Sequence, residues 1–311
     1  MLRRMLLAAS ESDRIRHLLV SAPLARGVVA RYVAGDEAAD GVAVAGQLAA
    51  TGLLVTLDHL GEDTSDARQA AAVADEYARL LGLLKAQGLT QGGRAEVSVK
   101  PTAVGLDLAE HGEKTAIENI ARICAAAREA DTTVTVDMEE HTHVDSTLRI
   151  VRTLRDDHPD LGCVIQSQLR RSADDCADLA TQGSRVRLCK GAYNAPPDVA
   201  FATRAEVDRS YARCLRMLMR GSGYPMFATH DPRLIEIAGA QAHLTGRGPG
   251  DFEYQMLYGI RPAEQQRLAD SGAQVRVYVP YGNDWYAYLV RRLAERPANV
   301  AFFARSLATR S

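Results

Sequence analysis

The chain has few cysteines and no long apolar run. Its five cysteines are scattered without a CxxC pair, which argues against a disulfide framework and a zinc site and favours a reducing compartment. They are Cys124, Cys163, Cys176, Cys189 and Cys214. The apolar residues near the start are too few for a signal peptide because charge resumes at Glu11. No run approaches the roughly 20 residues that span a bilayer. We therefore expect a cytoplasmic protein, and contact with the inner face of the membrane as a peripheral protein stays open.

An excess of charge of either sign is also missing. The formal net charge is -2, so the whole molecule does not attract polyanions, and we expect no nucleic-acid partner. The chain has 311 residues, of which 47% are hydrophobic, and can bury a large core. No Pro/Gly-rich linker divides it, and α/β barrels reach this length undivided. The sequence therefore predicts a single domain.

Short apolar, β-branched runs alternate with longer amphipathic stretches, the pattern of repeated βα units around a parallel sheet. Eight runs are expected to be strands: 52–57, 95–99, 133–136, 163–166, 185–189, 225–228, 252–256 and 274–279. The stretches between them predict helices, among them 65–87, 113–129, 144–156, 173–181 and 199–220.

Strands joined by helices run parallel, and eight of them with right-handed crossovers close most simply into a barrel. The alternative is a doubly wound sheet, but the first strand is followed by residues 57–61, which are not a Gly-rich dinucleotide turn. We expect a distorted (β/α)8 barrel of the TIM type over residues 51–311. Residues 1–50 have helical patterning without a strand and predict a helical arm outside the barrel.

Polar residues follow almost every expected strand, at the barrel end where active sites of this fold lie. Any one of them could be solvated or paired structurally, but so many together predict a functional site. They are Asp58, His59, Lys100, Asp137, Glu139, Glu140, Gln166, Gln168, Arg187, Lys190, Thr229, His230, Asp231, Gln255 and Tyr278.

Three of these residues are cations. Lys100, Arg187 and Lys190 at one barrel mouth indicate an anionic ligand such as a pyrophosphate. Lys190 precedes Gly191 and Ala192, whose small side chains let a backbone approach a phosphate closely. The histidines do not have the spacing of a zinc or iron site, so we expect no metal.

The segment 283–295 predicts a final helix over the mouth. Its neighbours Arg291 and Arg292 point about 100° apart and can grip one carboxylate only if the helix lies across the mouth. The alternative is a solvated edge in which Glu295 pairs with Arg291 across one helical turn.

Seven motifs, in this order and spacing, resemble the proline dehydrogenase family. The resemblance covers residues 52–307, and the linked set is far more specific than any one motif. The motifs are VSVK at 97–100, VDMEE at 136–140, RLCKGAY at 187–193, FATHD at 227–231, FEYQML at 252–257, YVPYG at 278–282 and LVRRLAE at 289–295.

The resemblance implies FAD-dependent oxidation of L-proline to 1-pyrroline-5-carboxylate, with a hydride passing from C5 of proline to N5 of the flavin and then electrons to a quinone. Asp137 and Arg187 would act at the flavin. Tyr278 favours proline over hydroxyproline, since relatives that prefer hydroxyproline tend to have a small residue there. The implied substrate-binding residues are Lys100, Tyr193, Leu257, Tyr278, Arg291 and Arg292.

The resemblance also implies which residues hold FAD. Arg187 would lie beside N5, and Glu295 would close the last helix onto the site. The full implied set is Met138, Gln166, Arg187, Lys190, Gly191, Ala192, Arg204, Thr229, His230 and Glu295. Oxidation of the pyrroline product would fall to a separate dehydrogenase that docks transiently.

Two other functions stay open from the residues alone. One is a barrel lyase or aldolase in which Lys100 or Lys190 forms a Schiff base with a carbonyl substrate. The other is a ligand-binding barrel without catalysis, which should have lost the Arg291 and Arg292 pair.

Overall fold

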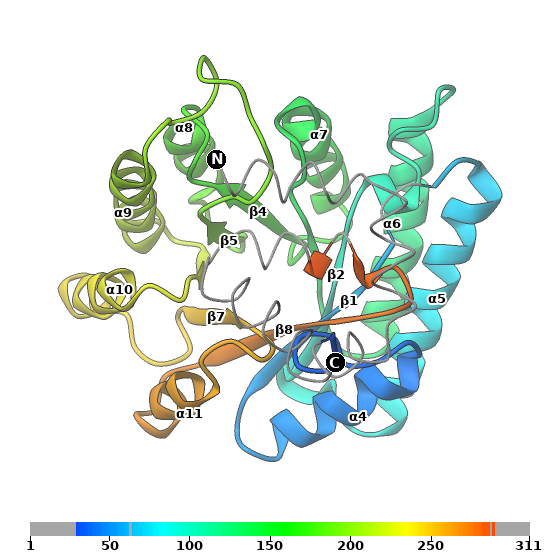
Figure 1. Cartoon of the computed structure of the whole chain (residues 1–311), viewed down its shortest axis with the longest axis horizontal. Helices are drawn as coiled ribbons and strands as arrows, with labels where there is room; N and C mark the ends of the chain where they lie inside the picture. The colour runs from blue at the N-terminus through cyan, green and yellow to red at the C-terminus, as the bar shows by residue number, and fades with distance from the viewer. Residues whose placement is uncertain (1–28, 62–63, 287, 290–311) are drawn as a thin grey trace, which may run out of the picture.

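The computed structural model describes residues 29–61, 64–286 and 288–289. Its centre is a closed barrel of eight parallel strands in sequence order, completed where Leu54 of the first strand lies opposite Arg276 of the last (Figure 1). The predicted α/β barrel is therefore confirmed. The strands are β1 (Leu54–His59), β2 (Ala95–Val99), β3 (Val134–Val136), β4 (Gly162–Gln166), β5 (Arg185–Cys189), β6 (Tyr224–Ala228), β7 (Glu253–Leu257) and β8 (Val275–Tyr281).

Helices that follow the strands form the outer ring (Figure 1). Most begin and end within two residues of the predicted bounds, but the helix expected from residue 199 begins at Arg204, because Thr203 caps it with a reciprocal Thr203–Glu206 hydrogen-bond pair. The helices are α5 (Ala67–Ala86), α6 (Gly112–Glu129), α7 (Val144–Arg155), α8 (Ser172–Leu179), α9 (Arg204–Arg220), α10 (Pro232–Thr245) and α11 (Pro262–Asp270). Short 3-10 turns are η1 (Gln91–Gly93), η2 (Thr102–Val104) and η3 (His141–His143).

Helix α4 (Ala38–Ala49) packs outside the barrel against β1, β8 and α5. Gly41 allows this close approach, since a Cβ there would lie 3.2 Å from the side chain of Leu57. The described part of the N-terminal region thus agrees with the expected helical arm. The boundary at residue 50 stays a prediction. The predicted final helix over the mouth lies largely outside the described residues.

The two faces of each strand have different chemistry. Outward residues such as Val55 and Val97 are fully buried and pack in the apolar layer between the sheet and the helix ring. The inward residues next to them, Thr56 and Glu96, are polar and equally buried. Barrels of this type usually fill their interior with branched apolar side chains. This interior is filled largely with hydrogen-bonded polar and charged groups instead.

Candidate active site at the carboxyl ends of the strands

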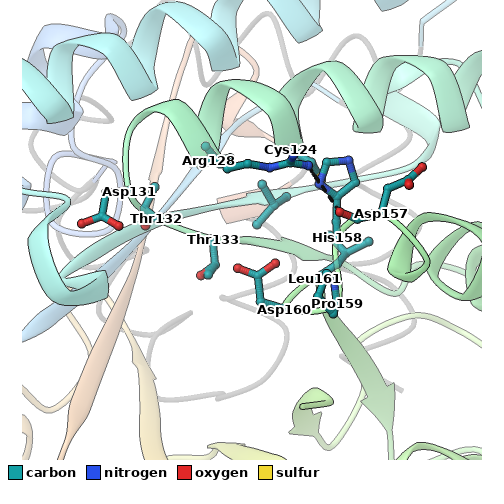
Figure 2. Close-up of a pocket in the computed structure, with 12 residues that line it drawn as sticks. Cys124, Arg128, Asp131, Thr132, Thr133, Asp157, His158, Pro159, Asp160 and Leu161 are labelled. Atoms are coloured by element: carbon teal, nitrogen blue, oxygen red, sulfur yellow. Dashed lines mark hydrogen bonds between the residues drawn. The ribbon is translucent and has the colours of Figure 1, made fainter.

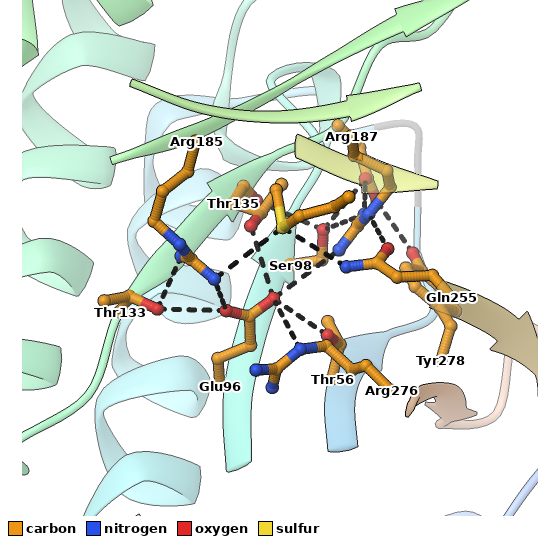
Figure 3. Close-up of polar contacts among 12 residues, drawn as sticks. Thr56, Glu96, Ser98, Thr133, Thr135, Arg185, Arg187, Gln255, Arg276 and Tyr278 are labelled. Atoms are coloured by element: carbon orange, nitrogen blue, oxygen red, sulfur yellow. Dashed lines mark hydrogen bonds and ion pairs between the residues drawn. The ribbon is translucent and has the colours of Figure 1, made fainter. Parts of the chain in front are cut away.

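A buried carboxylate lies among three arginines inside the barrel. Glu96 points inward from β2 and lies 2.6 Å from Arg185, 3.7 Å from Arg187 and 3.8 Å from Arg276 (Figure 3). Burial raises the pKa of Glu96, but the attraction of the three guanidinium groups outweighs it and holds the pKa well below its usual range. The ionised carboxylate therefore fixes the arginines from below.

Arg187 stands above Glu96 and is held on two sides. Its Nη1 donates to Asp137 at 2.7 Å and to Ser98 at 3.0 Å, and its Nε donates to Gln255 at 2.5 Å. The side chain is only 5% exposed, so these bonds act in a low-dielectric setting. Its Nη2 makes no hydrogen bond with a described residue, only the longer ion pair with Glu96. One buried donor thus lacks a close acceptor.

Tyr278 completes this unit from β8. Its hydroxyl donates to the second oxygen of Asp137 at 2.7 Å, and the Arg187 guanidinium lies 5.3 Å from its ring centroid (Figure 3). Burial, with the nearby Asp137 charge, raises the pKa of Tyr278 well above its usual range, so the phenol stays a donor. The structure joins Asp137, Arg187 and Tyr278, three of the predicted site residues, by direct contacts.

Lys100 is paired with Asp58. The ammonium lies 2.6 and 2.7 Å from the two carboxylate oxygens, and both residues are buried. Burial raises the pKa of Asp58; Lys100 opposes this, and the net shift is upward. Because a Schiff-base lysine must react as a neutral amine, this ion pair disfavours Lys100 as a nucleophile.

Lys190 belongs to a cluster that the sequence did not reveal. Its ammonium lies 2.6 Å from Asp208 of α9 and 3.1 Å from Asp231. Arg233 reaches both carboxylates, and Arg204 approaches Asp231 at 3.9 Å. Three cations and two carboxylates leave one net positive charge. The sequence did not indicate Asp208 as a partner of Lys190, because Asp208 lies on a helix, away from any strand end.

The loops after β3, β4 and β5 contact one another. Gln166 donates to the carbonyls of Met138 and Glu139 at 2.9 and 2.7 Å. Gly191 has φ +101°, and a Cβ there would lie 2.5 Å from the side chain of Gln168. Gln166 therefore supports the β3 loop, and Gly191 is required by close packing as well as by its backbone conformation.

Glu139, by contrast, has a structural task. Its carboxylate accepts from the backbone N–H of Thr102 at 3.0 Å and from the Thr102 hydroxyl at 2.6 Å.

The loops after β6 and β7 meet through His230. The backbone N–H of Leu257 donates to Nε2 of His230 at 3.0 Å, so a neutral ring carries its proton on Nδ1. Thr229 accepts from the N–H of Asp231 at 3.1 Å. His230, a predicted cofactor residue, therefore lies beside Leu257, a predicted wall of the substrate site.

Three predicted residues, Arg291, Arg292 and Glu295, lie outside the described residues. Sequence reasoning in turn missed Glu96 and Ser98, which touch Arg187 directly. A signal was present, because Glu96, Ser98 and Lys100 alternate along β2 and must share its inward face.

A separate hollow of about 310 Å³ lies near the amino ends of β3 and β4, away from these groups (Figure 2). There Arg128 lies 2.8 Å from Nδ1 of His158. Asp131, Asp157 and Asp160 also line the hollow. It is outside the candidate site because it opens at the other end of the strands. In the described ranges, no three His, Cys, Asp or Glu side chains gather to hold a metal.

Comparison with known proteins gives a consistent picture. A family model described as proline dehydrogenase matches residues 42–305. The chain is 37% identical over 278 residues to Proline dehydrogenase 1 of Bacillus subtilis subsp. natto, and 38% identical over 279 residues to Proline dehydrogenase of Deinococcus radiodurans. Each alignment covers 89% of this chain and 89% of the relative.

Among solved structures, the barrel is similar to proline utilization A from Bdellovibrio bacteriovorus inactivated by N-propargylglycine. The TM-score is 0.80 at 24% sequence identity, over 92% of this chain and 34% of that chain. This likeness concerns the fold.

Proposed function

The chain belongs to the proline dehydrogenase family and is an oxidoreductase acting on proline, and on this basis we propose that it binds FAD and moves a hydride from C5 of L-proline to N5 of the flavin. The product would be 1-pyrroline-5-carboxylate. The observation that carries the proposal is the buried unit of Arg187, Asp137 and Tyr278 at the carboxyl ends of the strands.

The donor set at the barrel rim suits a flavin dinucleotide. The Lys190 cluster has one net positive charge for a pyrophosphate and lies next to the Gly191 turn. Arg187 adds a buried guanidinium group that Asp137 and Ser98 hold in one orientation. The residues proposed to hold FAD are Met138, Gln166, Arg187, Lys190, Gly191, Ala192, Arg204, Thr229, His230 and, outside the described residues, Glu295.

Lys100 is proposed to bind the proline carboxylate. Asp58 holds its ammonium in place before substrate arrives, so little side-chain ordering is left for the moment of binding. Arg291 and Arg292 are proposed as the other two cations on the carboxylate. Tyr193, Leu257 and Tyr278 would wall the ring, and this fixed orientation replaces a bimolecular encounter.

Arg187 is proposed to stabilise the negative charge that develops during hydride transfer. FAD, when bound, supplies the hydride acceptor. Asp137, Ser98 and Gln255 keep the guanidinium in one orientation, so no reorganisation is needed during the reaction. Donation from the nitrogen lone pair requires a neutral proline amine, so activity should rise with pH through the ionisation of that amine. A flat profile from mildly acidic to alkaline pH contradicts this step.

Two partners are proposed beyond the substrate. A quinone would take the electrons, and a separate pyrroline-carboxylate dehydrogenase would take the product through transient contact. No helix among the described residues has the length and apolar character needed to span a bilayer.

An absorption spectrum of the purified protein tests the cofactor and the substrate together. We expect flavin bands that bleach when L-proline is added without oxygen. A protein that is colourless after incubation with FAD would overturn the cofactor proposal. Flavin bands that proline leaves unchanged would overturn the hydride step.

The substitution Arg291→Met tests the carboxylate clamp. We expect a steep rise in the proline KM with FAD still bound, because one guanidinium partner of the carboxylate is lost. Arg267→Met on the exposed face of α11 is the matched control and should keep the wild-type KM. An unchanged KM in Arg291→Met removes that residue from the site.

A further inference from the structure

Arg261 has a backbone conformation that its residue type rarely adopts. It lies between β7 and α11 with φ 53° and ψ 51°, in the left-handed region, and directly precedes Pro262. Residues with a side chain avoid this region, and a following proline favours extended backbone instead. In the described ranges His111 and Asp131 also have positive φ, but histidine and aspartate tolerate it better. An arginine here indicates a side-chain contact that offsets the backbone cost.

The side chain of Arg261 makes such a contact with the loop after β6. Its Nη1 donates to the backbone carbonyl of His230 at 2.7 Å. Its Nη2 lies 3.7 Å from Glu264, but that carboxylate is bound more closely by Arg267, at 2.7 and 2.9 Å. Within the described part of the chain, the carbonyl of His230 is therefore the closest partner of the Arg261 guanidinium.

The segment 257–261 holds His230 at a second point. The N–H of Leu257 donates to Nε2 of the His230 ring at 3.0 Å. The first residue of the segment thus binds the ring, and the last residue binds the carbonyl. Two bonds at separate points restrict both the position and the rotation of His230.

The segment 257–261 is itself fixed to the barrel. Gln265, only 3% exposed, donates from Nε2 to the carbonyls of Leu257 and Ile260 at 3.0 and 2.9 Å. The N–H of Tyr258 donates to the carbonyl of Tyr278 on β8 at 2.9 Å. The two bonds from this segment to His230 therefore place that histidine relative to β7 and β8.

We infer that Arg261 is a positioning residue that holds His230 and Leu257 in one fixed arrangement. The inference rests on the proposed function, in which His230 binds FAD and Leu257 walls the proline ring. Without the Arg261 bond, the carbonyl of His230 loses its link to the segment 257–261, and the two residues move more independently. Small displacements of binding groups weaken both contacts, because each depends on exact placement.

Arg261→Gly tests the inference, because glycine adopts the left-handed backbone without strain and only the side chain is lost. The FAD dissociation constant, measured by quenching of flavin fluorescence, should rise about tenfold, as expected for a lost hydrogen bond from a charged donor. At saturating FAD the proline KM should rise severalfold while kcat changes little, since Arg187 and its partners are untouched. Arg261→Lys keeps a charged donor and should recover most of the FAD affinity.

The matched control is Asp131→Gly, which relieves a positive φ at the amino end of the barrel, away from the candidate site. It should keep the wild-type FAD affinity and proline KM. Wild-type values in Arg261→Gly would overturn the inference, and so would equal losses in the control. In a His230→Ala background, Arg261→Gly should cause no further loss of FAD affinity. A fully additive loss would show that Arg261 does not act through His230.

Hydrogen exchange at the Leu257 amide gives a readout that needs no flavin. This N–H is bonded to His230, so its exchange should become about tenfold faster in Arg261→Gly and stay unchanged in Asp131→Gly. Unchanged exchange in Arg261→Gly would contradict the inference. A wild-type protein that binds no FAD would refute the proposed function, and the exchange rates would still decide the role of Arg261.

Discussion

At the scale of single residues, the candidate site depends on how Arg187 is held. Gln255 accepts from its Nε, and Gln255 itself donates to Glu253 at 2.5 Å. An ionised Glu253 carboxylate has no proton to donate, so the amide nitrogen of Gln255 must face Glu253 and its oxygen must face Arg187. Glu253 in turn accepts from Arg276 at 2.7 Å. The orientation of one guanidinium therefore depends on a chain of buried contacts through β7.

Gln255→Met should lower kcat by about tenfold to a hundredfold while changing the proline KM little. The substitution keeps the volume but removes the acceptor of a hydrogen bond to a charged donor, which is worth about 1.5–3 kcal/mol. Steady-state kinetics over a range of proline concentrations measure the two parameters separately.

The matched control for Gln255 is Gln274→Met, which removes an amide at the amino end of the barrel, where Gln274 binds Tyr224. It should lower thermal stability and leave kcat unchanged. If Gln255→Met also keeps the wild-type kcat, Gln255 only fills space and does not position Arg187.

At the scale of elements, the strands could be predicted from the sequence, but the side-chain contacts between strand ends and helices could not. All eight strands and most helices follow from the alternation of apolar runs and amphipathic stretches, because each strand is covered on its outer face by a helix. Strand β2 also shows its inward face through the alternation of Glu96, Ser98 and Lys100. The pairing of Lys190 with Asp208 could not be predicted, because the distance between a strand end and the next helix depends on loop geometry that no local pattern encodes.

Helix α9 supplies a carboxylate to the candidate site. Its Asp208, near the first turn of the helix, binds the ammonium of Lys190 at 2.6 Å. The start of this helix is fixed by Thr203, whose hydroxyl accepts from the N–H of Glu206 at 3.2 Å and whose own N–H donates to the Glu206 carboxylate at 2.9 Å. The cap therefore helps to position a carboxylate of the candidate site.

Thr203→Ala should lower the free energy of unfolding by about 1 kcal/mol, the usual cost of losing an N-cap hydroxyl. Urea denaturation at neutral pH measures this change. Thr245→Ala serves as control, because among the described residues the Thr245 hydroxyl bonds only to carbonyls of its own helix. A loss in Thr203→Ala no larger than in the control would show that the capping pair contributes nothing to stability.

At the scale of the whole molecule, the barrel interior is built as a balanced set of charges. Four carboxylates, Asp58, Glu96, Asp137 and Glu253, face four cations, Lys100, Arg185, Arg187 and Arg276. Such buried pairs add little stability compared with apolar packing, but removing one partner is costly because it leaves a charge without compensation. The interior therefore contains buried charges of fixed orientation in place of apolar side chains, and the charges at the rim can act on a substrate.

Glu96→Gln should lower the free energy of unfolding at neutral pH by about 3–5 kcal/mol, because three arginines lose their shared carboxylate. The pKa of Glu96 in the folded protein lies well below its ordinary value of 4.5, because the three guanidinium groups favour the ionised carboxylate. Its stabilising contribution is therefore fully present above that value and is lost as pH falls toward the folded-state pKa. The difference between wild type and Glu96→Gln should shrink by about 1.4 kcal/mol per pH unit below pH ~4.5. Denaturant unfolding across this range measures it.

The control for Glu96 is Glu118→Gln, which removes one partner of an exposed pair with Lys114 that spans 3.8 Å. Its effect should stay within about 0.5 kcal/mol at every pH, because solvent screens exposed pairs. A difference for Glu96→Gln that stays constant from neutral to acidic pH would contradict an ionised Glu96 at the centre of the network. In that case Arg187 would be held by Asp137, Ser98 and Gln255 without an ionised carboxylate below it.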